Sequence, residues 1–463
     1  MMSSLKENNE GVENMLNRNQ ERLVVIVAAI GMFLSTLDTG IINVALPFFR
    51  SYFHTSPNTV ALTVIGYTTS LAIFIMLFGI LSDQKGKLKI ALWGMIIFMG
   101  ASLLCGISTQ ISEIIVFRIV QGIGAAALQA TSASLITTLI RPQNQNKAIG
   151  TIGIMIGLGP VLGPSLGGLL LSLGSWRLIF LINIPFTLIG IICEGLLLRN
   201  VSEQLYDKQI DYQGFVLNAL MISGLLVGLN QLEKNDTRNL GLMFIGAAVV
   251  IAFILYNVEK HKNDAIIDIK ILKNSKTLIL LLQTMLFGFA SAVIFLLPPF
   301  FFENILHVST GMTGLLVLGA PVGIAIFSKV AGNLNDGTKN IKFSLIGILL
   351  MLLSFVGLAM IPSKLPPLWI TGLLFLYGVG GGFFQPSNVA ALMGAVGLAE
   401  QGKMSALQRM SQNVAIALGS SIGSIIMYEF GKNEYWGIKT GYLVTLILIG
   451  VTLLISFIKR KKL

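Results

Sequence analysis

Residue types that are common in soluble enzymes and metalloproteins are scarce in this chain. Only 11% of its 463 residues are charged, and it has 3 histidines and 2 cysteines. Cys105 and Cys193 fall in separate apolar runs, so their spacing fits neither a disulfide nor a metal site. His54, His261 and His307 lie between the apolar runs, which argues against a histidine proton relay inside them. We therefore expect no metal, no cofactor and no enzymatic activity.

Two further absences narrow the class of protein. The chain has no Walker-type phosphate loop, which argues against direct ATP drive, and no polar segment long enough for a soluble domain. Basic residues outnumber acidic ones by 32 to 21, but they are scattered over many short segments. Nucleic-acid-binding proteins instead gather basic residues into a patch. We therefore expect no nucleic-acid partner.

Long apolar runs dominate what is present. Apolar residues make up 54% of the chain, and its mean hydropathy is +0.80. A helix of roughly 20 apolar residues crosses the ~30 Å hydrocarbon core of a bilayer. The sequence therefore predicts an all-α membrane protein with fourteen transmembrane helices, near residues 23–46, 58–82, 88–109, 112–139, 146–172, 178–198, 212–230, 240–257, 277–302, 310–332, 341–361, 367–393, 403–428 and 438–458.

The segments between the helices predict how the protein is oriented in the membrane and that it consists of two repeated halves. Most of the Lys and Arg residues fall on the side of the two termini, which predicts a cytoplasmic membrane protein with both termini in the cytoplasm. Residues 79–83 and 332–336 repeat one Gly-to-Asp spacing, as expected of a transporter built from repeated halves. We expect a cytoplasmic tail at 1–22, a six-helix bundle at 23–200, two inserted helices and a connector at 201–276, a second six-helix bundle at 277–458, and a basic tail at 459–463.

Ionisable residues inside the expected helices are candidates for function, because burying a charge in a membrane costs ~2.5–3.5 kcal/mol or more. Asp38 lies roughly 22 Å into the first helix, and Arg118 about 9 Å into the fourth helix from the other side, so both reach a similar depth. They form either a structural ion pair or a proton-coupling pair. Glu194 is a possible additional coupling acid or an interfacial group. Arg409 could reach the cytoplasmic headgroups.

The fifth expected helix contains an unusual run of helix breakers. Its Gly and Pro residues predict a hinge or a close packing seam between helices, because glycine exposes bare backbone and proline bends a helix. The alternative is a kinked helix with no part in coupling. The residues concerned are Gly157, Gly159, Pro160, Gly163, Pro164, Gly167 and Gly168.

Amides and aromatic residues inside the expected helices are candidates for a substrate cavity. Aromatic rings could stack on flat amphiphiles or hold cations, although packing and interhelical hydrogen bonds explain such residues equally simply. The candidates are Asn43, Gln121, Gln129, Gln283, Phe287, Tyr377, Phe384 and Gln385.

Four ordered motifs resemble those of the major facilitator superfamily, and of its fourteen-helix drug:proton antiporters in particular. Residues 79–87 resemble the loop motif between the second and third helices, with Gln84 in place of the usual arginine. Residues 118–126 and 37–47 are similar to the motifs of the fourth and first helices. The run at 153–168, continued by 176–185, resembles the antiporter motif of the fifth helix.

The resemblance implies the major facilitator fold and a mechanism. Two six-helix bundles would rock about a central cavity and export lipophilic cationic or zwitterionic drugs in exchange for protons, with Asp38 as coupling acid and Arg118 as its partner. Gly79, Asp83, Gly86 and Lys87 would form a cytoplasmic gating loop. The partners would be drugs, protons and the bilayer, and the protein would act as a monomer. A narrow antibiotic exporter, such as one for tetracycline, an amphiphile exporter and an uptake symporter are the alternatives.

Overall fold

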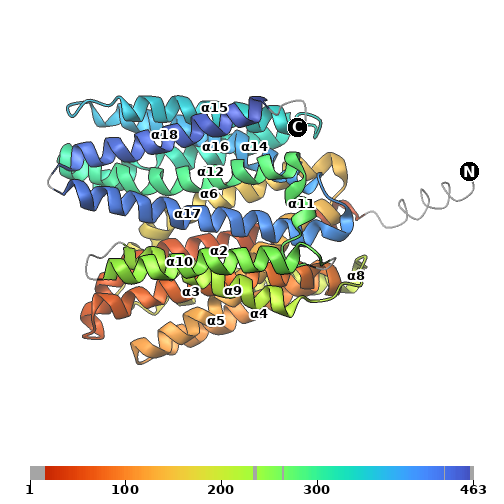
Figure 1. The fold of residues 1–463 in the computed structure, drawn as a ribbon. Helices are drawn as coiled ribbons and strands as arrows, with labels where there is room; N and C mark the ends of the chain where they lie inside the picture. Colours follow the sequence, from red (N-terminus) through yellow and green to blue (C-terminus); the bar gives the residue numbers. More distant parts are fainter. Residues whose placement is uncertain (1–15, 233–236, 263–264, 432, 459–463) are drawn as a thin grey trace, which may run out of the picture.

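The computed structural model describes residues 16–232, 237–262, 265–431 and 433–458, and in these ranges it is helical and contains no strand (Figure 1). The expected tail at 459–463 and most of the tail at 1–22 lie outside the described residues. The first helices are α2 (Arg18–Tyr52), α3 (Pro57–Lys85), α4 (Lys87–Ile107), α5 (Ile111–Leu139), α6 (Pro142–Ser172), α7 (Leu178–Leu181) and α8 (Asn183–Asn200). A connector then leads to α9 (Tyr212–Leu232), α10 (Arg238–Glu259) and the short α11 (Ile269–Lys273). The rest of the chain forms α12 (Ser275–Phe300) with η2 (Phe301–Ile305), α13 (Thr310–Leu316), α14 (Gly319–Leu334), α15 (Asn340–Ala359), α16 (Pro367–Met393), η3 (Leu398–Glu400), α17 (Gln401–Phe430) and α18 (Glu434–Ile458).

These helices fit the predicted membrane spans. Thirteen of the described segments are long and apolar enough to cross a membrane, and α6 supplies a continuous helix at the remaining expected position. The helices begin where the sequence offers caps: Ser56 accepts a hydrogen bond from the Thr59 N–H, with Pro57 at the first helical position. Gly86 separates α3 from α4 with φ of 98°, a conformation that favours glycine. The prediction of an all-α membrane fold is therefore confirmed.

The helices form two bundles that contact each other in a reciprocal way. In the first bundle α2 packs on α6 and α3 packs on α5, and in the second α14 packs on α16 and α12 packs on α17. Between the bundles, α6 packs on α14 and α17 packs on α3. The fifth helix of each half thus meets the second helix of the other, as expected of repeated halves. The inserted pair α9 and α10 pack on each other, and α9 also contacts α3 and α17.

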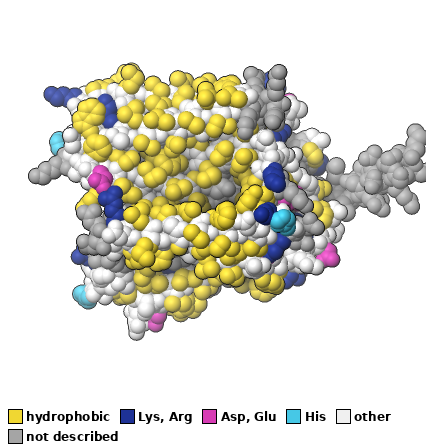
Figure 2. All heavy atoms as spheres, viewed as in Figure 1, with side chains coloured by type: hydrophobic (Ala, Val, Ile, Leu, Met, Phe, Trp, Pro, Cys, Tyr) yellow, Lys and Arg dark blue, Asp and Glu magenta, His cyan; other side chains and the backbone are white. Residues whose placement is uncertain are grey.

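The surface is that of a membrane protein. Figure 2 shows hydrophobic side chains over the middle of the viewed face, with Lys and Arg gathered towards its two ends. Many large apolar side chains are exposed on the helices, among them Val249 at 63% and Phe253 at 68% exposure on α10. We call the end at which α2 begins and α18 ends the basal end, at the right of Figure 1, and the opposite end the distal end.

Candidate transport site

Asp38 and Arg118 meet inside the first bundle. Asp38 on α2 is 2% exposed, Arg118 on α5 is 0% exposed, and the guanidinium Nη1 forms an ion pair with Asp38 Oδ2. The structure thus brings together two residues that are 80 positions apart in the sequence. An ion pair in a low-dielectric interior is stable only when its remaining hydrogen-bonding groups are also satisfied.

Amides complete the surroundings of the pair. Gln121 Nε2 donates to Asp38 Oδ1 over 3.0 Å, and Asn183 Nδ2 donates to the same oxygen over 3.2 Å. Gln121 Oε1 accepts a hydrogen bond of 2.7 Å from Arg118, and its amide nitrogen also reaches Ser102 Oγ at 2.9 Å. We call these five residues the Asp38 cluster. Three donors thus engage the two oxygens of one buried carboxylate.

The arginine has a second set of partners. Its Nε donates to the carbonyl oxygen of Thr63 over 3.1 Å, and its guanidinium carbon lies 4.1 Å from the centre of the Tyr67 ring. Its Nη2 is buried without a hydrogen-bond partner. Thr63, Tyr67 and Ser102 could not be predicted from the sequence, because such residues are common in membrane helices. Asn183 lies in the motif at 176–185, which was the only signal for it.

A chain of hydrogen bonds leads from this site to the second bundle. The hydroxyl of Tyr67 donates to the carbonyl oxygen of Ser35 over 3.1 Å, and Ser35 Oγ accepts from Gln129 over 3.3 Å. Gln129 Oε1 accepts in turn from Asn413 Nδ2 on α17 over 3.1 Å. Any movement of α17 against α5 therefore alters a chain that ends beside Arg118.

The glycines of α6 pack against the segment of α2 that carries Asp38. A Cβ atom on Gly163 would lie 2.6 Å from Gly40 Cα, and one on Gly167 would lie 3.1 Å from the carbonyl oxygen of Ile41. A Cβ on Gly159 would lie 2.9 Å from the nitrogen of Leu37. Since real Cβ atoms do not approach backbone below about 3 Å, bulkier residues at Gly159 and Gly163 would push the two helices apart.

A second face of α6 contacts the other bundle. A Cβ on Gly157 would lie 2.8 Å from Ile324 Cγ2, and one on Gly150 would lie 2.7 Å from the carbonyl oxygen of Ser328, both on α14. One helix thus holds Asp38 on one side and the bundle interface on the other. Gly168 differs, because nothing lies within 4 Å of its missing Cβ, so the expected close packing does not extend to it. The side chains of Pro160 and Pro164 lie outside the described part.

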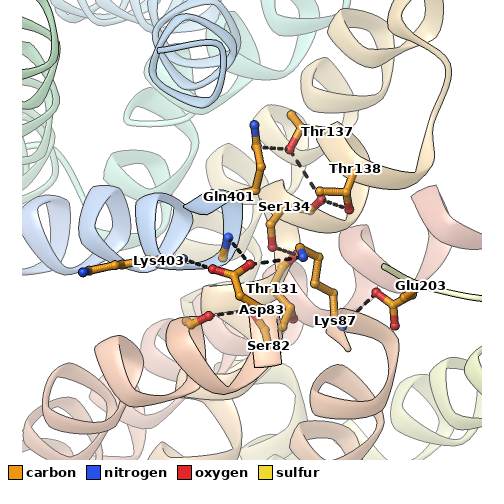
Figure 3. A network of polar contacts seen from close by, with 12 residues as sticks. Ser82, Asp83, Lys87, Thr131, Ser134, Thr137, Thr138, Glu203, Gln401 and Lys403 are labelled. Atoms are coloured by element: carbon orange, nitrogen blue, oxygen red, sulfur yellow. Dashed lines mark hydrogen bonds and ion pairs between the residues drawn. The ribbon is translucent and has the colours of Figure 1, made fainter. Parts of the chain in front are cut away.

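At the basal end Asp83 joins the two bundles (Figure 3). Its Oδ1 accepts a hydrogen bond of 2.9 Å from the Gly402 N–H, and its Oδ2 accepts one of 3.1 Å from the Lys403 N–H, both at the start of α17. Lys87 Nζ lies 3.1 Å from Asp83 Oδ1. The carboxylate therefore caps a helix of the second bundle, an arrangement favoured by the helix dipole. We call Asp83, Lys87, Gly402 and Lys403 the basal latch.

Neighbouring groups hold the basal latch in place. Glu203 in the connector accepts hydrogen bonds of 2.8 and 2.9 Å from the N–H groups of Lys87 and Leu88 at the start of α4. Burial raises the pKa of Glu203, while these two hydrogen bonds lower it. A Cβ on Gly79 would lie 2.8 Å from the carbonyl oxygen of Gly402, so α3 and α17 are in close backbone contact. Gln84, which replaces the usual arginine, donates to the carbonyl oxygen of Lys208 over 3.0 Å.

Two ionisable residues differ from the positions expected for interfacial groups. Glu194 is 0% exposed, and neither carboxylate oxygen has a hydrogen-bond partner. Arg409 is 4% exposed and donates to Gln412 Oε1 over 2.9 Å, so it does not extend to the headgroups. Both helices therefore place these side chains inward, where the cost of burial is not avoided by reaching water.

Most cavity candidates of the second bundle lie within its core. Phe287 packs on Phe384 with ring centres 5.2 Å apart, and Tyr377 shares a hydrogen bond of 2.8 Å with Ser291. Gln283 bonds to Ser344, Asn388 and Ser456. These contacts fit the packing alternative. Gln121 belongs to the Asp38 cluster, Gln129 joins the bundles, Gln385 has no hydrogen-bond partner, and the side chain of Asn43 lies outside the described residues.

A cavity of about 370 Å³ lies between the bundles at the basal end, away from Asp38. Thr137, Gln145 and Asn146 of the first bundle and Asn340 and Gln401 of the second contribute to its lining. Asn146 donates to the carbonyl oxygen of Asn335 over 3.0 Å, and Thr137 donates to Gln401 over 2.6 Å, as Figure 3 shows for the latter pair. In the described ranges, no group of three His, Cys, Asp or Glu side chains could hold a metal ion.

Comparison with known proteins identifies the family. A family model described as the Major Facilitator Superfamily matches residues 28–420 and, in a second match, residues 279–462. The chain belongs to the major facilitator superfamily. Members of this superfamily are transporters, and the two reciprocal bundles are those of a transporter.

Individual relatives include drug and vitamin transporters. The chain is 29% identical over 411 residues to the riboflavin transporter RibZ of Clostridioides difficile strain 630, with 88% of each protein covered. It is 26% identical over 422 residues to multidrug resistance protein 3 of Bacillus subtilis strain 168, with 89% of this chain and 81% of that protein covered. A solved structure of the proton:xylose symporter XylE with 6-bromo-6-deoxy-D-glucose has a TM-score of 0.61 at 15% identity over 96% of each chain, which shows the shared fold alone. The predicted major facilitator fold, and a place beside the multidrug efflux members of the superfamily, are confirmed.

Proposed function

We propose that this protein exports lipophilic drugs across the cytoplasmic membrane in exchange for protons. The basal end faces the cytoplasm, the protein acts as a monomer, and the proton gradient drives transport without a cofactor. Relatives named as multidrug resistance proteins support the drug cargo. The Asp38 cluster is the observation that carries the proposal, since a buried carboxylate beside an arginine is a group that can exchange a proton when its partners move.

In alternating access, the two bundles rock so that the central site opens to one side of the membrane at a time, and the Asp38 cluster couples this movement to proton exchange. A ligand shifts the balance between two conformations only if it binds them with different affinity. The glycine face of α6 packs on α2 around Asp38, and the other face of α6 packs on α14, so rocking of the bundles acts on the helix that holds Asp38. Protonation of Asp38 and binding of drug then favour opposite orientations. Glu194, buried without a partner, is a second group that can carry a proton.

The charge of the cargo is constrained by the pairing of Asp38. Its carboxylate is engaged by Arg118, Gln121 and Asn183, so it offers no free negative charge to a cationic drug in this conformation. Of the expected cargoes, zwitterions fit this arrangement better than simple cations. A second candidate function is transport of a flat heteroaromatic metabolite, favoured by the 29% identity to a riboflavin transporter.

The test is transport by everted membrane vesicles from a host that lacks its own drug pumps. With the protein present, lactate-energised vesicles should accumulate a fluorescent quinolone, and a protonophore should abolish the uptake. Vesicles with the empty vector provide the background. Accumulation of riboflavin but of no drug would support the second candidate. Movement of substrate out of everted vesicles, driven by the same gradient, would indicate an uptake symporter and contradict the proposed export.

A further inference from the structure

The second bundle contains a buried cation that no acid compensates. Arg409 on α17 is 4% exposed, and its only hydrogen bond given by the structure runs from Nη1 to Gln412 Oε1, over 2.9 Å. Its Nε is buried without a partner. Among the described residues, none of the ion pairs involves Arg409. A neutral amide oxygen accepts a hydrogen bond from the guanidinium but does not balance its charge.

The position of Arg409 on α17 directs it between the bundles. On one side of the helix, Gly402 and Ala406 pack on Gly79 of α3. On another side, Ala415 and Gly419 pack on α12. At 100° per residue, position 409 falls between these two contact stripes and opposite the face that turns outward. Arg409 therefore faces the space enclosed by the helices of both bundles.

Other polar groups without partners occur at the same level. Gln385 on α16 is 2% exposed, and neither its amide nitrogen nor its oxygen has a partner. Gln385 lies eight residues before the end of α16 at Met393, and Arg409 lies eight residues after the start of α17 at Gln401, about 12 Å from the basal end in both cases. These ends are in contact, because Gln401 Nε2 donates to the carbonyl oxygen of Met393 over 2.8 Å.

An unpaired guanidinium at this depth is costly. Arginine does not lose its proton under physiological conditions, and a buried charge without a counter-charge costs several kcal/mol or more. The first bundle avoids this cost at Arg118 by supplying Asp38. The second bundle supplies only amides to Arg409, so the counter-charge has to come from a molecule that enters the site. A guanidinium beside amide donors suits a planar oxyanion, because its N–H groups match two oxygens at once.

We propose that Arg409, assisted by the unpartnered amide nitrogen of Gln385, binds the carboxylate or sulfonate group of an amphiphilic organic anion or zwitterion that the protein transports. The inference rests on the proposed function, since it names the chemical class of the cargo. The hydrogen-bonded chain from Tyr67 through Ser35 and Gln129 to Asn413 ends one turn from Arg409, so binding here also reaches the Asp38 cluster. The cargo is then held about 12 Å from the basal end, nearer that end than Asp38.

The test measures binding of three matched probes to the purified full chain in a neutral detergent. The probes are 2-naphthoate, 2-naphthylmethanol and 2-naphthylmethylammonium, which share one ring system and differ in charge. We expect the naphthoate to bind most tightly to the natural chain and to lose at least tenfold in affinity in Arg409→Gln. Arg409→Lys, which keeps the charge, should recover part of the loss. Arg199→Gln removes an exposed arginine at the end of α8 and should change nothing.

The outcomes separate this inference from the proposed function. Equal naphthoate affinity in the natural chain and in Arg409→Gln, with both eluting as folded monodisperse protein, would overturn the site. So would tighter binding of the ammonium probe. The binding is also measured with gluconate and with chloride as the buffer anion. Loss of naphthoate binding in chloride would show that chloride alone fills the site, and would reassign the site to a small inorganic ion. Binding can be measured without a proton gradient. If naphthoate binding depends on Arg409 but vesicles show no proton-driven transport, this inference is upheld and the proposed function is rejected.

Discussion

The two bundles treat a buried arginine differently. Arg118 in the first bundle is paired with Asp38 and also bonds to Gln121 and to the Thr63 backbone. Among the residues that the structure describes, Arg409 in the second bundle bonds only to Gln412. The first arrangement balances the charge of its arginine with a carboxylate, although the guanidinium Nη2 has no hydrogen-bond partner. The second arrangement lacks a counter-charge, which the proposed ligand would supply. Under the proposed function, the first half of the molecule handles the proton and the second half binds the charged part of the cargo.

Neutralising each arginine tests this contrast most strongly. Arg118→Gln leaves the Asp38 carboxylate buried without its cation, and removing one partner of such a pair costs about 3–5 kcal/mol. Arg409→Gln removes an uncompensated charge, so it should leave stability unchanged or raise it. The measurement is the unfolding temperature of both variants in detergent without added ligand. An equal fall in both would contradict the contrast.

Two glycines of α6 allow a packed position to be compared with an open one. Gly163→Leu would drive its side chain into the α2 backbone at Gly40, whereas Gly168→Leu would enter open space. We expect the first to lower the unfolding temperature by several degrees and to abolish drug accumulation in vesicles, because overpacking costs about 1–3 kcal/mol or more. The second should behave as the natural protein does. Normal transport by Gly163→Leu would show that α6 is a structural helix without a role in coupling.

The two Gly-to-Asp repeats place a matched pair of aspartates, Asp83 and Asp336, at the basal end. Asp83 is 0% exposed and bonds to α17 across the interface, whereas Asp336 is 57% exposed and bonds to nearby Thr338 and Lys339. Asp83→Asn removes the charge that caps α17, which should cost about 1 kcal/mol or more and open the basal end. Faster alkylation of a cysteine placed at Thr137, in an otherwise cysteine-free chain, would report this opening. Asp336→Asn should not change the rate, and an equal increase for both would reject the basal latch.

A smaller effect is expected from Glu203 behind the basal latch. Burial raises its pKa, so the folded chain holds this proton to a higher pH than the unfolded chain does. Folding stability from this group is therefore present at low pH and falls as the pH rises through the raised pKa. Glu203→Gln should reduce the loss of thermal stability between acidic and neutral pH. An unchanged pH profile would contradict this prediction and show that the two hydrogen bonds to α4 cancel the effect of burial on the pKa of Glu203.

Much of this arrangement follows from the sequence, and the rest depends on tertiary packing. The depths of Asp38 and Arg118 could be predicted because helical rise is constant, and the glycine run of α6 predicted close packing. The sequence did not show that α6 uses two faces, since that requires knowing where α14 lies. Ser102, Tyr67 and Thr63 were missed because only tertiary contact distinguishes them from many similar residues.

Arg409 shows a different limit of sequence reasoning. From its position within an apolar helix, the Arg409 side chain could either reach the lipid headgroups or be buried, because a long side chain can bend towards water. Packing of α17 against both α3 and α12 closes that route, and neither contact can be read from α17 alone. Likewise, the repeated Asp336 could not be distinguished from Asp83 until the residues facing them were known.

The central claim is that proton exchange takes place at Asp38. The direct measurement is proton release from the lumen of acid-loaded everted vesicles on addition of a transported drug, compared between the natural chain and Asp38→Asn. Asp38→Asn keeps the size of the side chain and removes its proton exchange. The account predicts drug-induced proton release with the natural chain and none with Asp38→Asn, although drug binding to the purified variant persists. Undiminished drug-induced proton release by Asp38→Asn would contradict it.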